Sequence, residues 1–146
     1  MNGTRNGTLT LNQAVHGMLA THPHPGEFLN AGIAQCVEAC LICAVTCTAC
    51  ADACLAEDMV AELRECIRTN LDCADICQAT GYGLVRQTHV DWRLLYHQLE
   101  ACQAVCRKCA SICEQHAKMH EHCRVCAEAC RQCEQACDKM RAALPA

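Results

Sequence analysis

Aromatic residues are scarce in this sequence, which has one Trp, one Phe and two Tyr among its 146 residues. Large rings usually supply much of the buried apolar surface of a domain, so this core must be built from other side chains. Basic residues are also few, because 12 Lys and Arg stand against 16 Asp and Glu, which gives a formal net charge of -4. A nucleic-acid partner is therefore not expected, since such partners require a basic surface.

The N-terminal residues lack the marks of a targeting segment. They contain neither a basic stretch followed by an apolar run nor a pair of adjacent arginines. The sequence contains no run of about 18 apolar residues, so a membrane span is not expected. We therefore expect a cytoplasmic protein with no membrane partner, in a compartment where thiols stay reduced and disulfides are exceptional.

Helix-breaking residues are absent from most of the chain. Pro occurs only at positions 23, 25 and 145, and no Gly lies between Gly32 and Gly81. Such long stretches of Ala, Glu, Gln, Leu and Cys predict helices rather than strands. A turn is expected at 119–121, because one helix over 91–142 would be roughly 80 Å long. We expect Asp58 to cap the second of four long helices. The expected helices are a short amphipathic one at 9–20 and long ones at 27–55, 59–79, 91–118 and 122–142.

Cysteine is abundant, and the 18 cysteines recur at helical spacing. In CVEACLICAVTCTACADAC, which runs from Cys36 to Cys54, consecutive cysteines are 4, 3, 4, 3 and 4 positions apart. This is the heptad spacing of side chains that face the core of a helix bundle. The pattern Cys-x3-Cys-x2-Cys-x3-Cys returns in 102–113 and 126–137. The predicted core-facing thiols are Cys36, Cys40, Cys43, Cys47, Cys50, Cys54, Cys66, Cys73, Cys77, Cys102, Cys106, Cys109, Cys113, Cys123, Cys126, Cys130, Cys133 and Cys137.

Short connections between four such helices favour an antiparallel up-down four-helix bundle. The predicted fold class is therefore all-α, with a Cys-lined core and a short additional helix at the N-terminus. A chain of this length suits one domain with its own core. We divide it into an N-terminal extension at 1–26 and a Cys-rich bundle at 27–146.

A thiol-lined core has three explanations. Packing alone is disfavoured, because Cys is much smaller than Leu and a bundle packed on thiols alone would contain costly cavities. Disulfides are disfavoured by a reducing compartment and by the poor orientation of neighbours along one helix. Soft metal ions fill the space best, since thiolates prefer Cu(I), Zn(II) or iron–sulfur clusters.

Charge distinguishes among these metals. Iron–sulfur ligands usually lie in loop motifs that include a Pro, whereas these cysteines lie on predicted helices. A Zn(II) site with four thiolates carries a charge of about -2, and no Lys or Arg occupies a core-facing position to offset it. Bridging thiolates that share Cu(I) give a neutral core. We therefore expect multiple Cu(I) ions, on the order of one per thiol.

The heptad count also identifies residues at the two ends of the bundle. At the end that holds the first and third interhelical turns, it places Met59, His116, Met119 and His120. Thioether and imidazole both bind Cu(I), so we interpret this end as the mouth through which metal enters the core. His116 and His120 could also be ordinary helix-end residues that the helix dipole favours. His122 flanks the mouth but lies out of register.

The opposite end is predicted to be closed by the apolar side chains of Leu29, Ile33, Leu84, Trp92, Leu95, Leu99, Met140 and Leu144. Asn70 occupies a core-facing position and is expected to hydrogen-bond within the core. Leu41, Ile42, Val45 and Leu55 point outward in the heptad count. We expect the N-terminal helix or another subunit to cover them.

These cysteine patterns resemble those of the four-helix-bundle copper storage proteins. Because it lacks a targeting segment, the sequence resembles the cytosolic members of that family. The resemblance covers about 27–142 and rests on the patterns in 36–54, 102–113 and 126–137. It implies a Cu(I) store, a homotetramer, and a storage role for all 18 cysteines. It further implies that His116 and His120 admit the metal, with a looser match for Met59 and Met119.

We therefore expect cytosolic storage or buffering of Cu(I), with copper ions and further copies of the chain as partners. A zinc or general thiol buffer, similar in role to a metallothionein, is the alternative. No Ser/His/Asp set, Gly-rich phosphate loop or pair of core carboxylates is evident. The chain is not expected to be an enzyme.

Overall fold

The computed structural model describes residues 7–24 and 30–145. Within these ranges the chain forms α-helices and one short 3₁₀-helix, without strands. The all-α prediction is confirmed. The elements are α1 (Leu11–Ala20), α2 (Asn30–Leu55), η1 (Val60–Leu63), α3 (Arg64–Val85), α4 (Trp92–His116) and α5 (Glu121–Ala143).

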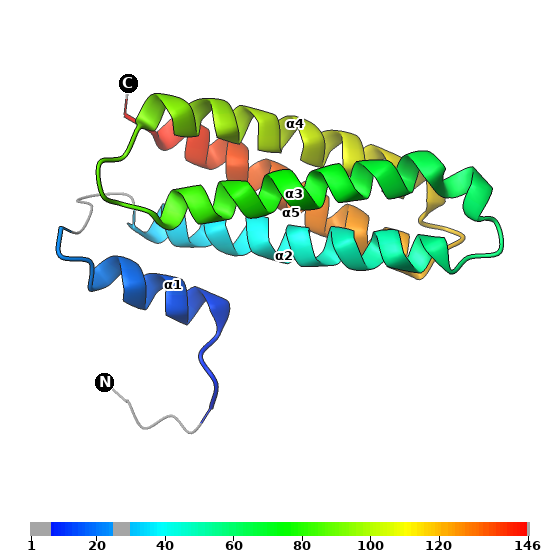
Figure 1. The fold of residues 1–146 in the computed structure, drawn as a ribbon, viewed down its shortest axis with the longest axis horizontal. Helices are drawn as coiled ribbons and strands as arrows, with labels where there is room; N and C mark the ends of the chain where they lie inside the picture. The colour runs from blue at the N-terminus through cyan, green and yellow to red at the C-terminus, as the bar shows by residue number, and fades with distance from the viewer. Residues whose placement is uncertain (1–6, 25–29, 146) are drawn as a thin grey trace.

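The four long helices lie side by side along the long axis of the molecule (Figure 1). Helix α2 packs against α3 and α5, and α4 packs against the same two helices. The α2–α3 and α4–α5 connections share one end, while the α3–α4 connection and the C-terminus lie at the other (Figure 1). This arrangement is the predicted antiparallel up-down four-helix bundle, with α1 packed on the outside of α2.

Side-chain caps define the starts of two helices. The Thr10 hydroxyl accepts a hydrogen bond from the Gln13 backbone N–H at 3.0 Å, and the Gln13 side chain accepts one from the Thr10 N–H at 2.9 Å. This reciprocal pair is a capping box. The Asp91 carboxylate accepts from the Leu94 N–H at 3.0 Å and caps α4.

Helix α3 differs from the prediction at both ends. Asp58 does not cap it, because η1 follows Met59 and α3 begins only at Arg64. Its C-terminal end extends to Val85, through two glycines that the sequence suggested were breakers. A Cβ at Gly81 would lie 3.1 Å from Cδ2 of Leu41. Glycine therefore lets α3 approach α2 closely, and this packing outweighs a helix-propensity cost of about 1 kcal/mol.

The connection between α4 and α5 lies close to its predicted place. Helix α4 ends at His116, two residues before the predicted end, and α5 begins at Glu121. The α4–α5 turn therefore falls at 117–120 rather than at 119–121. His120 precedes α5 with an extended backbone, and its side chain is buried.

Apolar residues on the outer face of α2 are only partly covered by α1. Val15 and Leu19 of α1 are buried, whereas Val45 on α2 is 71% exposed. Ile42 and Leu55 point outward, as predicted, but α1 leaves them exposed. Leu41 is an exception, because its side chain turns toward Gly81 of α3 rather than outward.

One segment is long and apolar enough to cross a membrane by length and composition, although no uninterrupted run of about 18 apolar residues occurs in the sequence. Gly32–Leu55 in α2 meets that requirement by length and composition, and half of its most apolar window is buried inside the bundle. Its apolar character comes largely from cysteine and alanine, which the bundle core buries. A core helix of a soluble protein passes the same test.

The end opposite the mouth contains most of the predicted apolar side chains. Ile33, Leu84, Leu95, Leu99 and Met140 are buried. Trp92 and Leu144 are partly buried and pack against the core, and Leu29 lies outside the described residues.

Candidate metal centre

All 18 cysteines are buried, and none forms a disulfide. Their Sγ atoms meet on the bundle axis because each helix presents cysteines at steps of three and four residues. At one level, Cys43 of α2 lies 3.8 Å from Cys73 of α3 and 3.8 Å from Cys130 of α5. Cys106 of α4 completes this level at 3.9 Å from Cys73. Four helices thus each contribute a sulfur atom to one layer of the core.

The thiols form overlapping groups rather than separate sites. Cys43, Cys47, Cys73 and Cys130 form one group whose Sγ atoms all lie within 4.8 Å of one another. The neighbouring groups reuse some of these thiols: Cys47 and Cys130 also group with Cys109 and Cys126, and Cys43 also groups with Cys77, Cys106 and Cys133. A ligand that belongs to two groups can bridge two metal ions. The core is therefore built for a chain of metal ions.

Among residues 7–24 and 30–145, no Lys or Arg is buried in the core, where it could neutralise thiolates. In the described part of the chain, the buried polar residues are Thr69, Asn70, Thr80, Gln103 and His120. Uncompensated charge in such an interior is very costly. Metal ions must therefore supply the positive charge when the thiols ionise.

Two thiols near the mouth have a raised pKa. Loss of hydration, together with the charge of the neighbouring Cys66, raises the pKa of Cys54 to about 12 and that of Cys123 to about 11. These thiols are neutral near pH 7, and a metal ion that binds them must displace their protons.

Asn70 lies at the centre of a hydrogen-bond network inside the core, as the sequence predicts. Its Oδ1 accepts from the thiols of Cys109 at 2.9 Å and Cys126 at 3.1 Å. Its Nδ2 donates to Cys66 Sγ at 3.4 Å. The amide is fully buried, and these partners satisfy it.

The mouth contains a cluster of two histidines and one carboxylate. Oε2 of Glu57 lies 2.9 Å from Nε2 of His122 and 3.1 Å from Nδ1 of His120. The imidazole rings of His120 and His122 stack with their centroids 5.4 Å apart. The hydrogen bond from His122 lowers the pKa of Glu57, so the carboxylate is ionised and holds both rings in place.

His122 is the ligand candidate that the heptad count misses. Its Nδ1 lies 3.4 Å from Cys50 Sγ and 3.6 Å from Cys123 Sγ. Together with Cys54 these residues form a group that could hold a metal ion. His120 offers a second free nitrogen, because its Nε2 is buried without a hydrogen-bond partner among the described residues. The Nδ1 atom of His122 therefore lies beside two of the outermost thiols.

The other predicted mouth residues lie in different environments. His116 is partly buried. Hydrogen bonds from Cys113 and Cys50 lower the pKa of Cys66 to about 3, and the nearby His116 makes a smaller contribution. Met59 is partly buried and packs against the core. Met119 is 61% exposed, because it lies in the turn that follows α4. The Met119 side chain therefore faces solvent, next in the chain to His120.

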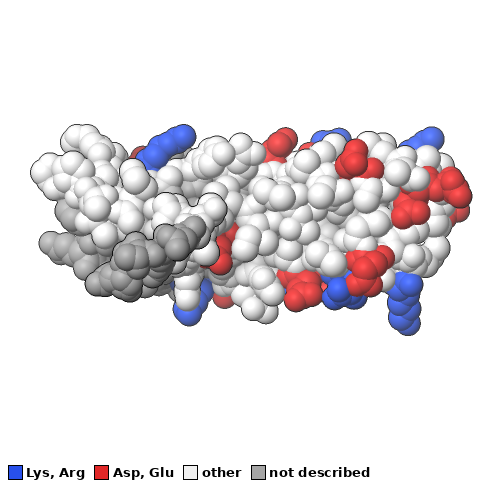
Figure 2. All heavy atoms as spheres, turned by 90° about the horizontal axis from the view of Figure 1, so that it is seen from below, with Lys and Arg blue, Asp and Glu red and all other residues white. Residues whose placement is uncertain are grey.

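Acidic side chains surround the mouth. Figure 2 shows them on one flank, where they gather toward the end that holds the α2–α3 connection. Asp58, Glu62, Glu65 and Glu121 are exposed there, around the partly buried Glu57. Arg64 and Lys118 are exposed at the same end, and Glu121 pairs with Arg124. The carboxylates without such a partner attract cations to the opening.

Comparisons with known proteins agree with this geometry. A family model described as copper storage protein, Csp, matches residues 29–142. The structure of the copper storage protein Ccsp from Streptomyces lividans, loaded with 10 copper equivalents, matches with a TM-score of 0.86 and 53% identity. That match covers 88% of this chain and 98% of Ccsp.

Two further relatives show the same likeness. A cytosolic copper storage protein from Streptomyces lividans, with five coppers, matches with a TM-score of 0.78 and 56% identity over 79% of this chain and 96% of its own. The cysteine-rich protein YhjQ of Bacillus subtilis is 45% identical over 42 residues. This last match spans 29% of the present chain and 39% of YhjQ.

Proposed function

Because this chain belongs to the copper storage protein family, we propose that it stores many Cu(I) ions on the thiolates inside its four-helix bundle. The observation that carries this proposal is the continuous set of 18 buried, unoxidised thiols. Overlapping four-thiol groups run along this set. They provide bridging ligands along the axis of the bundle, which a store of many ions requires.

Electrostatics favours Cu(I) as the stored ion. Each Cu(I) ion that replaces one thiol proton leaves the core neutral, so filling can continue without building up buried charge. The capacity is then on the order of one ion per thiol. The ten copper equivalents in the related Ccsp structure support a store of this kind.

We assign the ligands from the geometry. All 18 cysteines hold the stored ions. His116, His120 and Met59 act at the mouth, where they pass ions from solvent to the outermost thiols, and Met119 adds an external thioether to this route. His122 joins them, because its Nδ1 faces the thiols of Cys50 and Cys123.

A zinc buffer is the second candidate. Sulfur–sulfur distances of 3.5–4.0 Å in the core also suit the edges of a tetrahedron with Zn–S bonds of about 2.3 Å. Its weakness is charge, because each site with four thiolates would carry about -2 in a core without cationic side chains.

We further propose that the protein is located in the cytoplasm, forms a homotetramer and is not an enzyme. The likeness to a cytosolic copper storage protein supports the location. The exposed apolar side chains of Ile42, Val45 and Leu55 on α2 support a subunit contact. We propose that the chain consists of an N-terminal extension at 1–26 and a bundle at 27–146. We also propose that it has no membrane or nucleic-acid partner.

Anaerobic titration of the reduced apoprotein tests the stored ion. Cu(I) is expected to bind until the ratio approaches the 18 thiols of the chain. Saturation of Zn(II) at roughly four ions with higher affinity than copper would instead support the zinc buffer. Light scattering after size-exclusion chromatography tests the tetramer in the same sample.

A further inference from the structure

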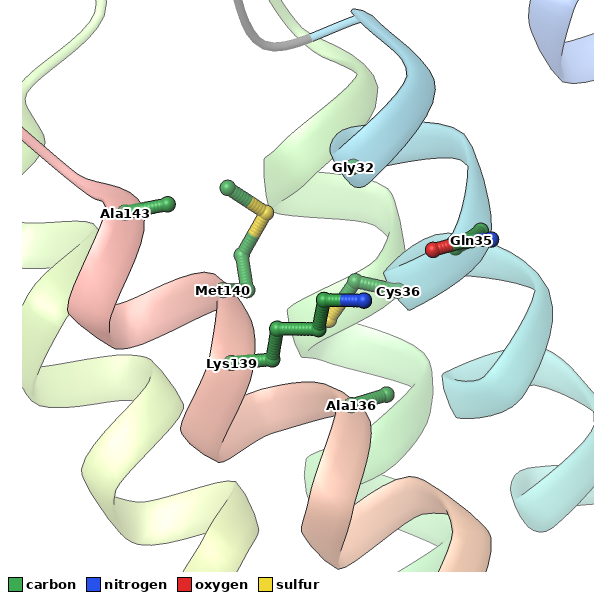
Figure 3. Close-up of a pocket in the computed structure, with 7 residues that line it drawn as sticks. All are labelled: Gly32, Gln35, Cys36, Ala136, Lys139, Met140 and Ala143. Carbon is green, nitrogen blue, oxygen red and sulfur yellow. The ribbon is translucent and has the colours of Figure 1, made fainter.

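A cavity of about 200 Å³ opens between α2 and α5 at the end opposite the mouth (Figure 3). Gly32, Ala136 and Ala143 line it with little side-chain bulk, while Cys36 and Met140 bring sulfur atoms to it. We call this space the rear cavity. Its presence modifies the prediction that apolar side chains alone close this end of the bundle.

Cys36 connects the rear cavity to the stored ions. Its thiol neighbours those of Cys137 and Cys40, which form a four-thiol group with Cys102 and Cys133. Cys36 is only 1% exposed, so its sulfur is reached through the cavity rather than from open solvent. An ion in the core can therefore reach Cys36 by exchange between adjacent thiolates without passing the mouth.

The residues that line the cavity determine which ligands it can bind. Lys139 reaches from α5 toward α2 across the opening (Figure 3). It makes no ion pair with the described residues, whereas Arg141 nearby pairs with Asp138 at 3.1 Å. An unpaired ammonium favours an anionic group. The cavity is smaller than the pockets of about 300–1,000 Å³ that hold drug-sized ligands. Its ligand is therefore smaller than a typical drug molecule.

Resting on the proposed function, we propose that the rear cavity is a second opening of the store, where a small thiol bearing a carboxylate withdraws Cu(I) from Cys36. Only a soft donor competes with a thiolate for Cu(I), and the carboxylate pairs with Lys139. The thioether of Met140 lies in the same cavity. It binds the Cu(I) ion while the incoming thiolate replaces that of Cys36.

The transfer is a ligand exchange that leaves the oxidation state unchanged. A Cu–S bond forms to the incoming sulfur, and the Cu–S bond to Cys36 breaks. The proton of the incoming thiol passes to the departing Cys36 thiolate. Copper remains Cu(I), so the step needs neither an oxidant nor a reductant.

Copper-loaded protein and two small thiols test this opening. The full-length protein is incubated without oxygen with L-cysteine, or with cysteamine, which has the thiol but no carboxylate. Copper that remains with the protein after gel filtration is measured over time. Gly32→Leu fills the cavity, and among the described residues no atom outside the local helix backbone lies within 4 Å of a Cβ at this position. Gly17→Leu is the matched control, since Gly17 is also helical with open space around it.

Gly32→Leu is expected to slow copper loss to cysteine about tenfold, because the thiol must wait for local opening of the bundle. Lys139→Gln should slow loss to cysteine about threefold, as expected for one exposed charge, and should not slow loss to cysteamine, because the lysine repels the ammonium group of that thiol. Gly17→Leu and Lys108→Gln should match the wild type, and all variants should keep the same copper capacity.

Two results would overturn the inference. Release from Gly32→Leu at the wild-type rate would show that copper does not leave through the rear cavity. Equal effects of Lys139→Gln on cysteine and cysteamine would remove the role of the carboxylate. A low copper capacity in the wild-type protein is a separate outcome, which would contradict the proposed function itself.

Discussion

Oε2 of Glu57 lies 2.9 Å from Nε2 of His122. This contact fixes the orientation of the imidazole ring, so that its Nδ1 faces the thiol of Cys50. A carboxylate that accepts from one ring nitrogen leaves the other free to bind metal and makes it more basic.

We therefore predict that Glu57→Gln weakens binding of the first copper ions about tenfold, as is typical when such a supporting carboxylate is lost. Competition with a chromophoric Cu(I) chelator measures the change. Glu62→Gln, at an exposed position on η1, is the matched control and should bind as the wild type does. Unchanged affinity in Glu57→Gln would show that the carboxylate does not orient the ligand.

The paired variant His116→Ala/His120→Ala should load copper more slowly while keeping nearly the full capacity. Its histidines contact incoming ions at the mouth, but the thiols that hold the ions remain. We expect the loading rate from a Cu(I)–chelator donor to fall about tenfold in stopped-flow measurements. His97→Ala, on the exposed part of α4, serves as the control. A normal rate with a reduced capacity would mean that these histidines store copper rather than admit it.

Copper affinity should rise with pH. Burial raises the pKa of Cys54 to about 12 and that of Cys123 to about 11. Both thiols are protonated from pH 6 to 8, so each Cu(I) ion that binds there displaces protons. The apparent affinity of the outermost site is expected to increase about tenfold per pH unit for each proton displaced. Chelator competition at several pH values measures this slope.

The slope has an internal control. Cys123→Ala removes one of the protonated thiols and should reduce the slope by about one proton. An affinity that does not change between pH 6 and 8 would contradict the protonated state of these thiols.

Asn70→Ala should destabilise the apoprotein. The substitution removes the acceptor of the Cys109 and Cys126 thiols and leaves a cavity in the core. We expect the free energy of unfolding to fall by about 1–3 kcal/mol, measured by urea denaturation under reducing conditions. Gln78→Ala, on the exposed face of α3, should have little effect. Because Asn70 is not assigned as a metal ligand, copper capacity should not decrease.

The arrangement of the core was predictable from the sequence because the cysteines obey one helical period. Steps of three and four residues place Cys36 and Cys54 on the same face of one helix, seven positions per two turns. The structure buries both of them. Periodicity gives the direction of each side chain and therefore the composition of the core, without any knowledge of the neighbouring helices.

His122 could not be found in this way. It lies outside the heptad register, at the second residue of α5, and it reaches the metal group because Glu57 from another segment holds its ring. The local signal that could have identified it is the sequence His120-x-His122-Cys123 at a helix start. A count of core-facing positions ignores such contributions from helix termini.

The extent of α3 also depended on information from another helix. Gly81 and Gly83 have poor helix propensity, and they continue the helix because Gly81 allows Leu41 of α2 to pack closely. The sequence of α3 alone does not reveal that contact. Packing between elements decided this boundary, whereas spacing within one element decided the core.

Several thiols, among them Cys43, Cys47, Cys130 and Cys133, each belong to two four-sulfur groups. A half-filled protein therefore has many distributions of ions with similar energies, and the multiplicity of these microstates contributes mixing entropy. Successive ions then bind with gradually decreasing affinity instead of in separate steps. Such a protein buffers copper over a wide range of free copper concentrations, much as a polyprotic acid buffers over several pH units.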